Sequence, residues 1–338
     1  MHRKTAFGTV NGTEVPLIEL QDGLCAVTLI PLGAAVHSLR VPDRTGALVD
    51  VCLGYDTPDE YRRHDACFGG TVGRCANRIG GARFAIGGKT YRVTANEGEN
   101  CLHGGAEGFD KKLWRYVCAD SSVTFTLDSP DGEEGFPGAL HTEVTYTLAD
   151  GALCIDYRAV SDKDTVVNLT NHTYFNLSGH DSGRVDDQVL TVRAARYTPA
   201  GAGNIPTGAL APVDGTPLDL RAGAVLGERL HLPALAGSRG FDHNYVLDDG
   251  AEPVATLYSP RTGIAMDVTT TLEGMQVYTA GFLIERQGKG GVVYAAGHAV
   301  CLETQHFPDA VNQPSFPSPV LRVGETFRAQ TVYRFSVR

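Results

Sequence analysis

Val144-Thr145-Tyr146-Thr147-Leu148 and Leu153-Cys154-Ile155-Asp156-Tyr157 are the two stretches that decide the fold class of this chain. In both, apolar side chains recur at every second position, which is the period of a half-buried β-strand. Between them lies Ala149-Asp150-Gly151, and Asp-Gly is a typical turn of a tight hairpin. The three stretches together predict an antiparallel β-hairpin.

The same period of two recurs along the whole chain of 338 residues. A second hairpin is expected in 84–93, with its turn at Gly87-Gly88. Further strands are expected at 123–127, 189–192, 254–258, 265–270, 275–279, 300–302 and 326–337. Helical periodicity is scarce, and short helices are expected only at 57–64 and near 218–226.

Many short strands separated by turn residues predict stacked antiparallel sheets. The 40 Gly and 17 Pro residues supply the turns, and no Pro-rich or Ser-rich linker and no repeat of fixed period divides the sequence. We therefore predict an all-β fold, a large antiparallel β-sandwich with few short helices, formed by residues 1–338 as a single domain.

Composition excludes several classes of partner. Hydrophobic residues make up 42% of the chain, enough for a packed core, so intrinsic disorder is not expected. The net charge is -10 and Lys and Arg form no cluster, whereas a nucleic-acid surface needs clustered positive charge. No apolar run approaches the roughly 20 residues of a membrane span. We expect neither a nucleic-acid nor a membrane partner.

The cysteines and the N-terminus favour a cytoplasmic protein. None of the eight cysteines forms a C-x-x-C pair, which argues against a zinc ribbon or a thioredoxin-like motif. Several lie in apolar alternation, where a buried free thiol behaves as a small hydrophobe. The stretch after Met1 is polar rather than the apolar core of a signal peptide.

One segment of strand-like sequence is unusually polar. Within 166–177, Asn171-His172-Thr173-Tyr174-Phe175-Asn176-Leu177 follows Asn168, so that three asparagines fall within nine residues. Asn is disfavoured in strands because its amide competes for backbone hydrogen bonds. We expect these side chains to line a polar pocket, with His172 either a functional group or a satisfied core histidine.

A carboxylate ends a second apolar run, in Glu303-Thr304-Gln305-His306-Phe307-Pro308-Asp309-Ala310. A carboxylate and an imidazole aimed into one pocket suit a reaction that removes one proton while delivering another. His306 follows Glu303 by three residues, and on a strand such residues point to opposite faces. A joint metal site is therefore not expected.

Two glycine-rich stretches indicate close backbone turns. In Asn100-Cys101-Leu102-His103-Gly104-Gly105, two glycines allow the chain to bend closely around a ligand, although an ordinary turn explains them as well. The stretch 69–80 has the glycine density of a phosphate loop but lacks Gly-Lys-Ser/Thr and a following amphipathic helix, so nucleotide binding is not expected. Its Asn77 and Arg78 could donate to a polyhydroxylated ligand, while the alternative for Arg78 is a structural ion pair.

Two further segments carry candidate polar groups. Asp242 lies just before a strand, where loop residues reach the pocket of a β scaffold. In Gly274-Met275-Gln276-Val277-Tyr278-Thr279, alternation places Gln276 and Tyr278 on one face and Met275 and Val277 on the other.

Together these segments resemble the galactose mutarotase (aldose 1-epimerase) family over roughly residues 7–335, in unbroken order. The matching motifs are Gly-Arg-x-Ala-Asn-Arg-Ile at 73–79, Leu-His-Gly-Gly at 102–105, Gly-Phe-Asp-Lys at 108–111, Ser-Pro-Asp-Gly-Glu-Glu-Gly-Phe-Pro-Gly at 129–138, the His172 segment, Gly-Phe-Asp-His-Asn-Tyr at 240–245, and the Glu303 segment. The resemblance implies a β-supersandwich with an open sugar cleft and a cofactor-free enzyme that interconverts the α and β anomers of an aldose.

The resemblance also implies roles for named residues. Glu303 would be the base at the O1 hydroxyl and protonated His172 the acid at the ring oxygen O5, with a nearby carboxylate raising the pKa of His172. His103 would assist at the ring oxygen. The sugar hydroxyls would be held by Asn77, Arg78, Asp242 and Gln276, with a contribution from Tyr174.

Two other functions remain open at this stage. A relative that acts on hexose 6-phosphates would need additional basic residues at the cleft, and the chain is acidic. A sugar-binding module without catalysis would be indicated by loss of Glu303 or His172, and both are present. We expect a small-molecule sugar as the partner and a monomer or weak homodimer.

Overall fold

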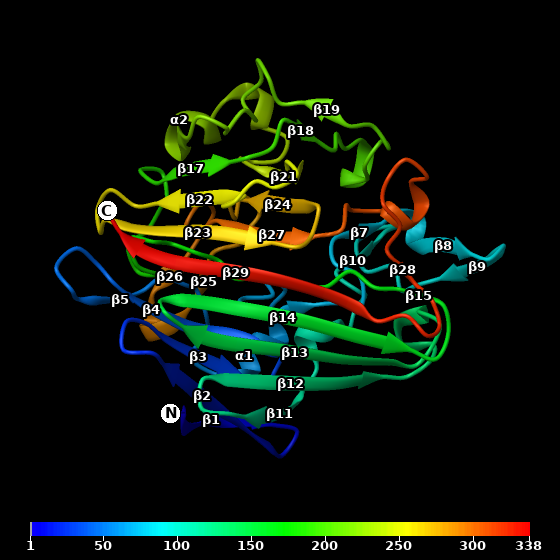
Figure 1. Cartoon of the computed structure of the whole chain (residues 1–338), viewed down its shortest axis with the longest axis horizontal. Helices are drawn as coiled ribbons and strands as arrows, with labels where there is room; N and C mark the ends of the chain where they lie inside the picture. The colour runs from blue at the N-terminus through cyan, green and yellow to red at the C-terminus, as the bar shows by residue number, and fades with distance from the viewer. Residues whose placement is uncertain (1) are drawn as a thin grey trace.

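The computed structural model describes residues 2–338, and its largest element is a nine-stranded antiparallel sheet. Its long strands cross Figure 1 side by side. In sheet order the strands are β11 (Arg115–Cys118), β12 (Ser122–Ser129), β13 (Leu140–Ala149), β14 (Ala152–Ser161), β29 (Phe327–Val337), β23 (Ile264–Thr270), β22 (Ala255–Tyr258), β17 (Val189–Val192) and β20 (Ala224–Val225).

The chain also forms two five-stranded antiparallel sheets. One contains β1 (His2–Val10), β2 (Thr13–Gln21), β3 (Ala26–Ile30), β4 (Ala35–Pro42) and β5 (Leu48–Asp50). The other contains, in sheet order, β19 (Ala211–Pro212), β18 (Arg196–Tyr197), β21 (Asp242–Val246), β24 (Gly274–Tyr278) and β27 (Cys301–Gln305).

Five short two-stranded ladders complete the β structure of the described chain. They pair β6 (Thr71–Val72) with β16 (Thr170–Asn171), β7 (Arg78–Ile79) with β10 (Cys101–Leu102), β8 (Arg83–Ile86) with β9 (Lys89–Arg92), β15 (Thr165–Val166) with β28 (Val320–Leu321), and β25 (Arg286–Gln287) with β26 (Val293–Tyr294). The strands predicted at 123–127, 189–192, 254–258, 265–270, 275–279, 300–302 and 326–337 are present with shifts of one or a few residues at their ends, whereas 166–177 is not a continuous strand.

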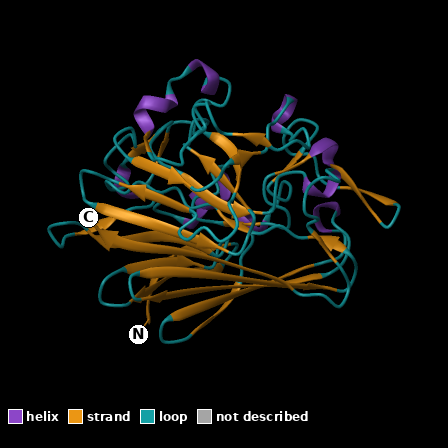
Figure 2. Cartoon of the chain, turned by 45° about the horizontal axis from the view of Figure 1, so that its top comes forward, coloured by secondary structure: helices purple, strands orange, loops and turns teal. Residues whose placement is uncertain are grey.

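Helices are few and short, as Figure 2 shows. The α-helices are α1 (Pro58–Arg63) and α2 (Leu226–Leu230), and single 3₁₀ turns occur at Gly80–Ala82, Phe109–Lys111, Glu133–Gly135, Ala202–Asn204, Pro233–Leu235, Lys289–Gly291 and Ala310–Asn312. Helix α1 lies where it was predicted, begun by a capping box between Thr57 and Glu60. The helix expected near 218–226 is misplaced, because residues 218–223 form turns and irregular chain, β20 follows at Ala224–Val225, and α2 begins only at Leu226.

The two predicted hairpins are both present. Strands β13 and β14 pair from Leu140 with Ser161 to Ala149 with Ala152. Asp150 and Gly151 join them with φ of 51° and 69°, the positive values that a type I′ turn requires. Along β13 the buried and partly exposed positions alternate without interruption, so one face of the hairpin packs inward.

The main core combines side chains from all three large sheets. Val27 of β3, Val144 of β13, Val268 of β23 and Leu302 of β27 belong to one continuous cluster, and each is at most 1% exposed. The stacked antiparallel sheets confirm the predicted all-β sandwich.

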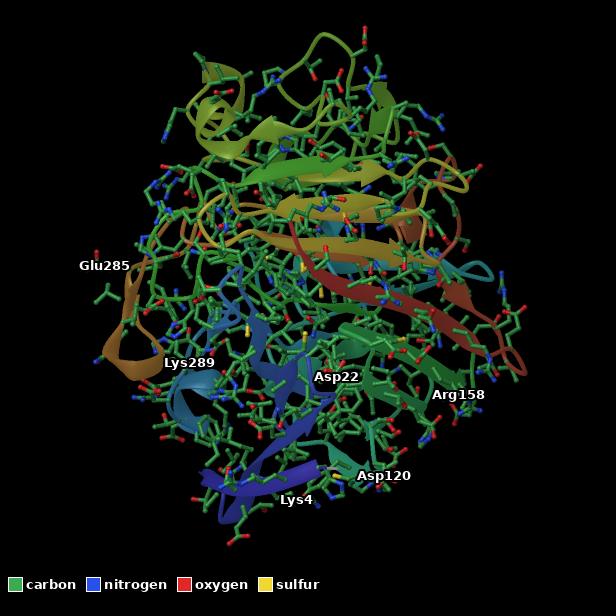
Figure 3. All side chains as sticks on the ribbon, turned by 60° about the vertical axis from the view of Figure 1, so that its left-hand side comes forward. Lys4, Asp22, Asp120, Arg158, Glu285 and Lys289 are labelled. Atoms are coloured by element: carbon green, nitrogen blue, oxygen red, sulfur yellow. The ribbon has the colours of Figure 1, made fainter. Side chains whose placement is uncertain are left out.

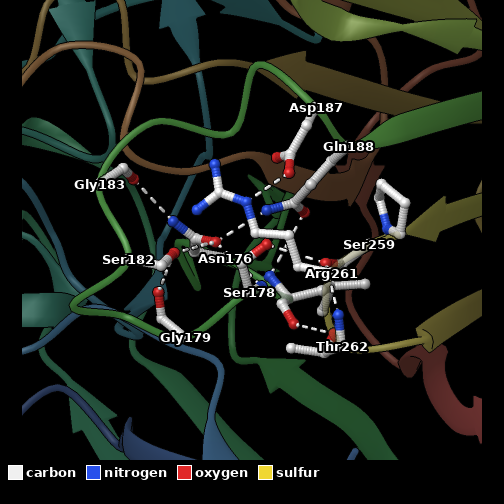
Figure 4. Close-up of polar contacts among 12 residues, drawn as sticks. Asn176, Ser178, Gly179, Ser182, Gly183, Asp187, Gln188, Ser259, Arg261 and Thr262 are labelled. Carbon is white, nitrogen blue, oxygen red and sulfur yellow. Dashed lines mark hydrogen bonds and ion pairs between the residues drawn. The ribbon is translucent and has the colours of Figure 1, made fainter. Parts of the chain in front are cut away.

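Hydrogen bonds and an ion pair hold the end of the predicted polar segment and the chain after it, as Figure 4 shows. Nδ2 of Asn176 donates to a backbone carbonyl at 2.8 Å, and its Oδ1 accepts from Nε2 of Gln188 at 2.7 Å. Close by, Nε of Arg261 donates to Oδ2 of Asp187 at 2.5 Å. These contacts fix the path of the chain where it leaves the candidate site.

All eight cysteines are free thiols. Within residues 2–338, no helix has the length and apolar character needed to cross a bilayer.

Candidate active site

All eight residues predicted from the sequence line one cavity of about 340 Å³. They are Asn77, Arg78, His103, His172, Tyr174, Asp242, Gln276 and Glu303. They come from positions far apart in the chain, so it is the fold that brings them together.

The floor of the cavity is the face of β21, β24 and β27. Gln276 lies opposite Glu303 in the ladder between β24 and β27, and its Nε2 donates to Oδ1 of Asp242 at 2.6 Å. The alternate residues of β24, Met275 and Val277, are fully buried in the main core. The predicted division of this strand into a polar and an apolar face is confirmed.

His172 is positioned by backbone pairing just beyond β16. Its N–H donates to the carbonyl of Gly70 at 2.9 Å, and its carbonyl accepts from the N–H of Gly69 at 3.0 Å. Its ring stacks on Tyr174 with ring centres 4.9 Å apart and planes 11° apart. These contacts hold the imidazole in one orientation beside Glu303, with 3.6 Å between His172 Nε2 and Glu303 Oε2.

The asparagines of this segment do not line the cavity, and that expectation is wrong. Asn168, Asn171 and Asn176 are at most 1% exposed, and their side chains hydrogen-bond backbone groups of neighbouring loops. Nδ2 of Asn171, for example, donates to the carbonyl of Gly69 at 2.7 Å. Because residues 167–169 and 172–177 are irregular rather than the continuous strand expected, their loops need such side-chain partners to satisfy buried backbone groups.

His103 sits in a turn that only glycine permits. Gly104 has φ of 89°, and a Cβ there would lie 2.0 Å from the carbonyl oxygen of Gly73. The turn brings the ring of His103 to a centre distance of 5.3 Å from the ring of His172. The backbone N–H of Asn77 donates to Nδ1 of His103 at 3.3 Å, which leaves the proton of the neutral ring on Nε2.

Arg78 forms the predicted structural ion pair and also lines the cavity. Its Nε and Nη2 donate to the two carboxylate oxygens of Glu97, each at 2.7 Å, which is the structural ion pair. Arg78 nevertheless lines the cavity, so the ion pair fixes the guanidinium at its wall.

Burial has the largest effect on the pKa values of Glu303 and His172. It raises the pKa of Glu303 well above its ordinary value, the negative charge of Asp242 adds to the rise, and Arg78 opposes it. Burial also lowers the pKa of His172 to about 4. The expectation that a nearby carboxylate would raise the pKa of His172 is therefore wrong, because loss of water penalises both charges more than their attraction at this separation compensates.

His103 follows the same trend. Burial, followed by the positive charges of His172 and Arg78, lowers the pKa of His103 well below its ordinary value. A neutral ring with its proton on Nε2 is a hydrogen-bond donor at neutral pH.

A metal ion is the other ligand that these side chains could hold. His103, His172 and Glu303 each offer one ligating atom, and the three atoms lie within 4.8 Å of one another. A metal-bound imidazole normally donates its other N–H, but Nδ1 of His103 faces the N–H of Asn77. The hydrogen bond therefore favours donation by His103 over metal ligation. His306 lies apart and bonds Glu273 through Nδ1 at 2.8 Å.

Sequence reasoning missed an aromatic residue at the mouth of the cavity. Phe282 lines the cavity and is 42% exposed, and its N–H donates to the hydroxyl of Tyr278 at 3.0 Å. Tyr278 also lines the cavity, and its ring stands edge-on to His172. Phe282 follows β24 in an irregular loop, where no periodicity marks it.

Arg286 forms hydrogen bonds across the opening of the same cavity. Its Nη1 donates to Oδ1 of Asp65 at 2.8 Å and to the hydroxyl of Tyr55 at 3.1 Å. The β25–β26 hairpin that carries it lies at one side of the molecule in Figure 3, marked by Glu285 and Lys289. The guanidinium thus ties this hairpin to the segment that follows α1.

Comparison with known proteins gives a consistent result over the whole chain. A family model described as Aldose 1-epimerase matches residues 16–334. Galactose mutarotase of Mus musculus is 43% identical over 339 residues, covering 99% of this chain and 98% of the relative, and Aldose 1-epimerase of Escherichia coli (strain K12) is 38% identical over 317 residues, covering 91% of each. The crystal structure of a GalM/aldose epimerase homologue from C. elegans matches with a TM-score of 0.88 and 32% identity, covering 96% of this chain and 99% of that one.

Proposed function

The chain belongs to the aldose 1-epimerase family, and from that premise we propose that it is an isomerase that interconverts the α and β anomers of free hexoses such as D-galactose and D-glucose. The observation that carries the proposal is the buried pair of His172 and Glu303, 3.6 Å apart in a cavity that is also lined by Asn77, Arg78, Asp242 and Gln276. We further propose that residues 1–338 act as one domain and that the enzyme is cytoplasmic, which its eight free thiols support.

Glu303 and His172 would carry the two proton transfers of ring opening. Glu303 takes the proton of the O1 hydroxyl, the C1–O1 bond becomes a carbonyl, the C1–O5 bond breaks, and His172 delivers its proton to O5. After rotation about C1–C2 the ring closes on the other face with the roles reversed. Each well-placed acid or base contributes roughly 10²–10⁴-fold, which suffices for a reaction that proceeds slowly in water.

The pKa shifts favour this direction of proton flow. Opening the ring converts an ion pair, ionised Glu303 with protonated His172, into a neutral pair. Burial raises the pKa of Glu303 and lowers that of His172, so each charged form is the stronger base or acid. Oε2 of Glu303 has no hydrogen-bond partner among the described residues, and a sugar hydroxyl would supply one.

The remaining wall groups would bind the sugar. His103, with its proton on Nε2, is placed to donate near the ring oxygen. Asp242 and Gln276, already hydrogen-bonded to each other, would hold hydroxyls together with Asn77 and Arg78. An aromatic face binds the apolar side of a pyranose, and Phe282 at the mouth offers one.

Charge at the cavity favours a free sugar over a sugar phosphate. Among the residues that line it, the cationic side chains are Arg78 and Arg286, and each is bound to a carboxylate, Glu97 and Asp65 respectively. A phosphate would have to displace those carboxylates. A binding module without catalysis would have no need of two buried groups whose charges are both disfavoured.

Polarimetry tests the proposal. Freshly dissolved α-D-galactose and α-D-glucose should reach anomeric equilibrium faster with the protein than without it, after exhaustive chelation and without nucleotide. Activity that disappears with EDTA and returns with zinc would contradict the acid/base mechanism.

A further inference from the structure

A second cavity lies on the far side of the loop that carries Phe282. Its volume is about 430 Å³, and its wall includes Arg184, His231, Arg239, Thr279 and Gly281. None of the described residues that line it is acidic, although the chain as a whole carries a net charge of -10. A hollow that has cationic side chains and no acidic one in its wall can attract a small anion.

Arg239 is the cation of this cavity that lacks a carboxylate partner. Arg184 is bound through Nε and Nη2 to both oxygens of Asp186, which neutralises it. Arg239 forms no ion pair with any of residues 2–338, and its guanidinium instead lies over the ring of Phe282, 5.0 Å from the ring centre. A guanidinium that stacks through its face keeps its N–H edge free for an anion.

Arg239 therefore links the two cavities through its contact with Phe282. Its side chain lines the second cavity, while the ring beneath it lines the first. The backbones of the two loops also pack closely, because a Cβ on Gly281 would lie 2.1 Å from the carbonyl oxygen of Arg239. An exposed arginine moves through many rotamers, and an anion bound to its edge would hold it on Phe282.

We propose that this second cavity is a binding site for a phosphate group, free or on a phosphorylated metabolite, and that its occupation strengthens sugar binding by fixing Arg239 on Phe282. The site itself stands apart from the proposed function; only the coupling assumes a sugar in the first cavity. An exposed cation–π contact contributes enough to change affinity by about two- to fivefold. Saturating phosphate should lower the KM for galactose by that factor.

The coupling must be reciprocal in binding. Galactose should tighten phosphate binding by the same factor by which phosphate tightens galactose binding. Isothermal titration of the full chain measures both affinities, with inorganic phosphate and with sorbitol 6-phosphate, which has no anomeric carbon, as probes. Tighter binding of sorbitol 6-phosphate would identify a phosphorylated metabolite, and equal binding would identify free phosphate.

Three variants separate the parts of the proposal. Arg239→Gln should lower phosphate affinity at least about tenfold and abolish the coupling. Phe282→Leu should keep phosphate binding and lose the coupling. Arg221→Gln is the matched control, an exposed arginine already bound to Asp214 and Asp219, and should change neither.

The outcomes distinguish this inference from the proposed function. Unchanged phosphate affinity in Arg239→Gln, or no phosphate binding to the wild type, overturns the site. Phosphate binding without any change in galactose affinity overturns the coupling. If the protein binds phosphate and galactose but does not speed mutarotation, the proposed reaction fails while the second site stands.

Discussion

Glu303→Gln should make the protein slower and more stable at the same time. Glutamine keeps the size of the side chain but cannot take a proton from O1, so kcat should fall at least about 10²-fold, which corresponds to about 2.7 kcal/mol or more in the barrier. The side chain of Glu303 is 3% exposed and its Oε2 has no hydrogen-bond partner among the described residues. Replacing a buried carboxyl whose ionisation is disfavoured and which lacks a hydrogen-bond partner relieves a penalty of about 1–3 kcal/mol.

The stability gain depends on pH in a definite direction. The folded-state pKa of Glu303 lies above the value of about 4.3 in the unfolded chain. The stability that this carboxyl contributes is therefore fully present below that unfolded value and is lost as pH rises through the folded one. Glutamine does not titrate, so the variant should exceed the wild type most at neutral and alkaline pH, and the difference should shrink toward pH 5.

Calorimetry and polarimetry read the two effects separately. At about 2.1 cal/mol/K per residue, 338 residues give about 0.7 kcal/mol/K, so 1–3 kcal/mol corresponds to a rise in Tm of roughly 1.5–4 °C. Glu273→Gln is the matched control, since Glu273 is bound to His306 outside the cavity and should give no rise. Near-normal turnover of Glu303→Gln would mean that the base is misassigned, and a lower Tm at neutral pH would refute the account of burial.

The pH profile of kcat/KM should be a bell that belongs to the coupled pair. Its acid limb should lie near 4, to which burial lowers the pKa of His172, and its alkaline limb above the ordinary carboxyl range, because burial raises the pKa of Glu303. In His172→Asn the alkaline limb should disappear, leaving weak activity that rises with pH to a plateau. If the limb is kept in His172→Asn and lost in His103→Asn, the acid is His103 instead. Asp242→Ala should raise the KM for galactose about tenfold or more with a smaller effect on kcat, measured by initial-rate polarimetry, because it removes a hydroxyl acceptor and the partner of Gln276. Phe282→Ala should raise the KM for galactose about two- to tenfold, and Phe282→Tyr should restore it, because an aromatic ring binds the apolar face of the sugar. An unchanged KM in Phe282→Ala would show that the ring does not contact the sugar.

The sequence predicted the all-β class, many of the strands and eight of the residues that line the cavity. Alternation and Asp-Gly or Gly-Gly turns are local signals, and they located the strands and both hairpins. The eight polar residues were found through ordered motifs, and the fold gathers them at one cavity. Phe282 carried no such signal, because an aromatic residue in an irregular loop becomes a platform only through tertiary contacts with Tyr278 and Arg239.

The asparagines show what periodicity cannot reveal. A polar residue in an apparent strand has two uses, to face a ligand or to satisfy buried backbone, and the sequence contains both kinds side by side. His172 faces the cavity, whereas Asn171 next to it donates to the carbonyl of Gly69. The distinction depends on whether the strand is continuous, and here it breaks after residue 171.

The direction of the His172 pKa shift was mispredicted because two opposing effects act on it, and the sequence indicates only one of them. Proximity to Glu303 gives the sign of their attraction, which favours a charged imidazole. The depth of burial, 5% exposure for His172 and 2% for Glu303, gives the size of the opposing desolvation, and only the fold determines it. Since desolvation acts against both charges, the favoured form is the neutral pair, with the proton on Glu303. The ion pair carries the same number of protons, and the proposed ring opening converts it into this favoured neutral form. The burial that defeats the predicted pKa shift therefore supports the proposed reaction.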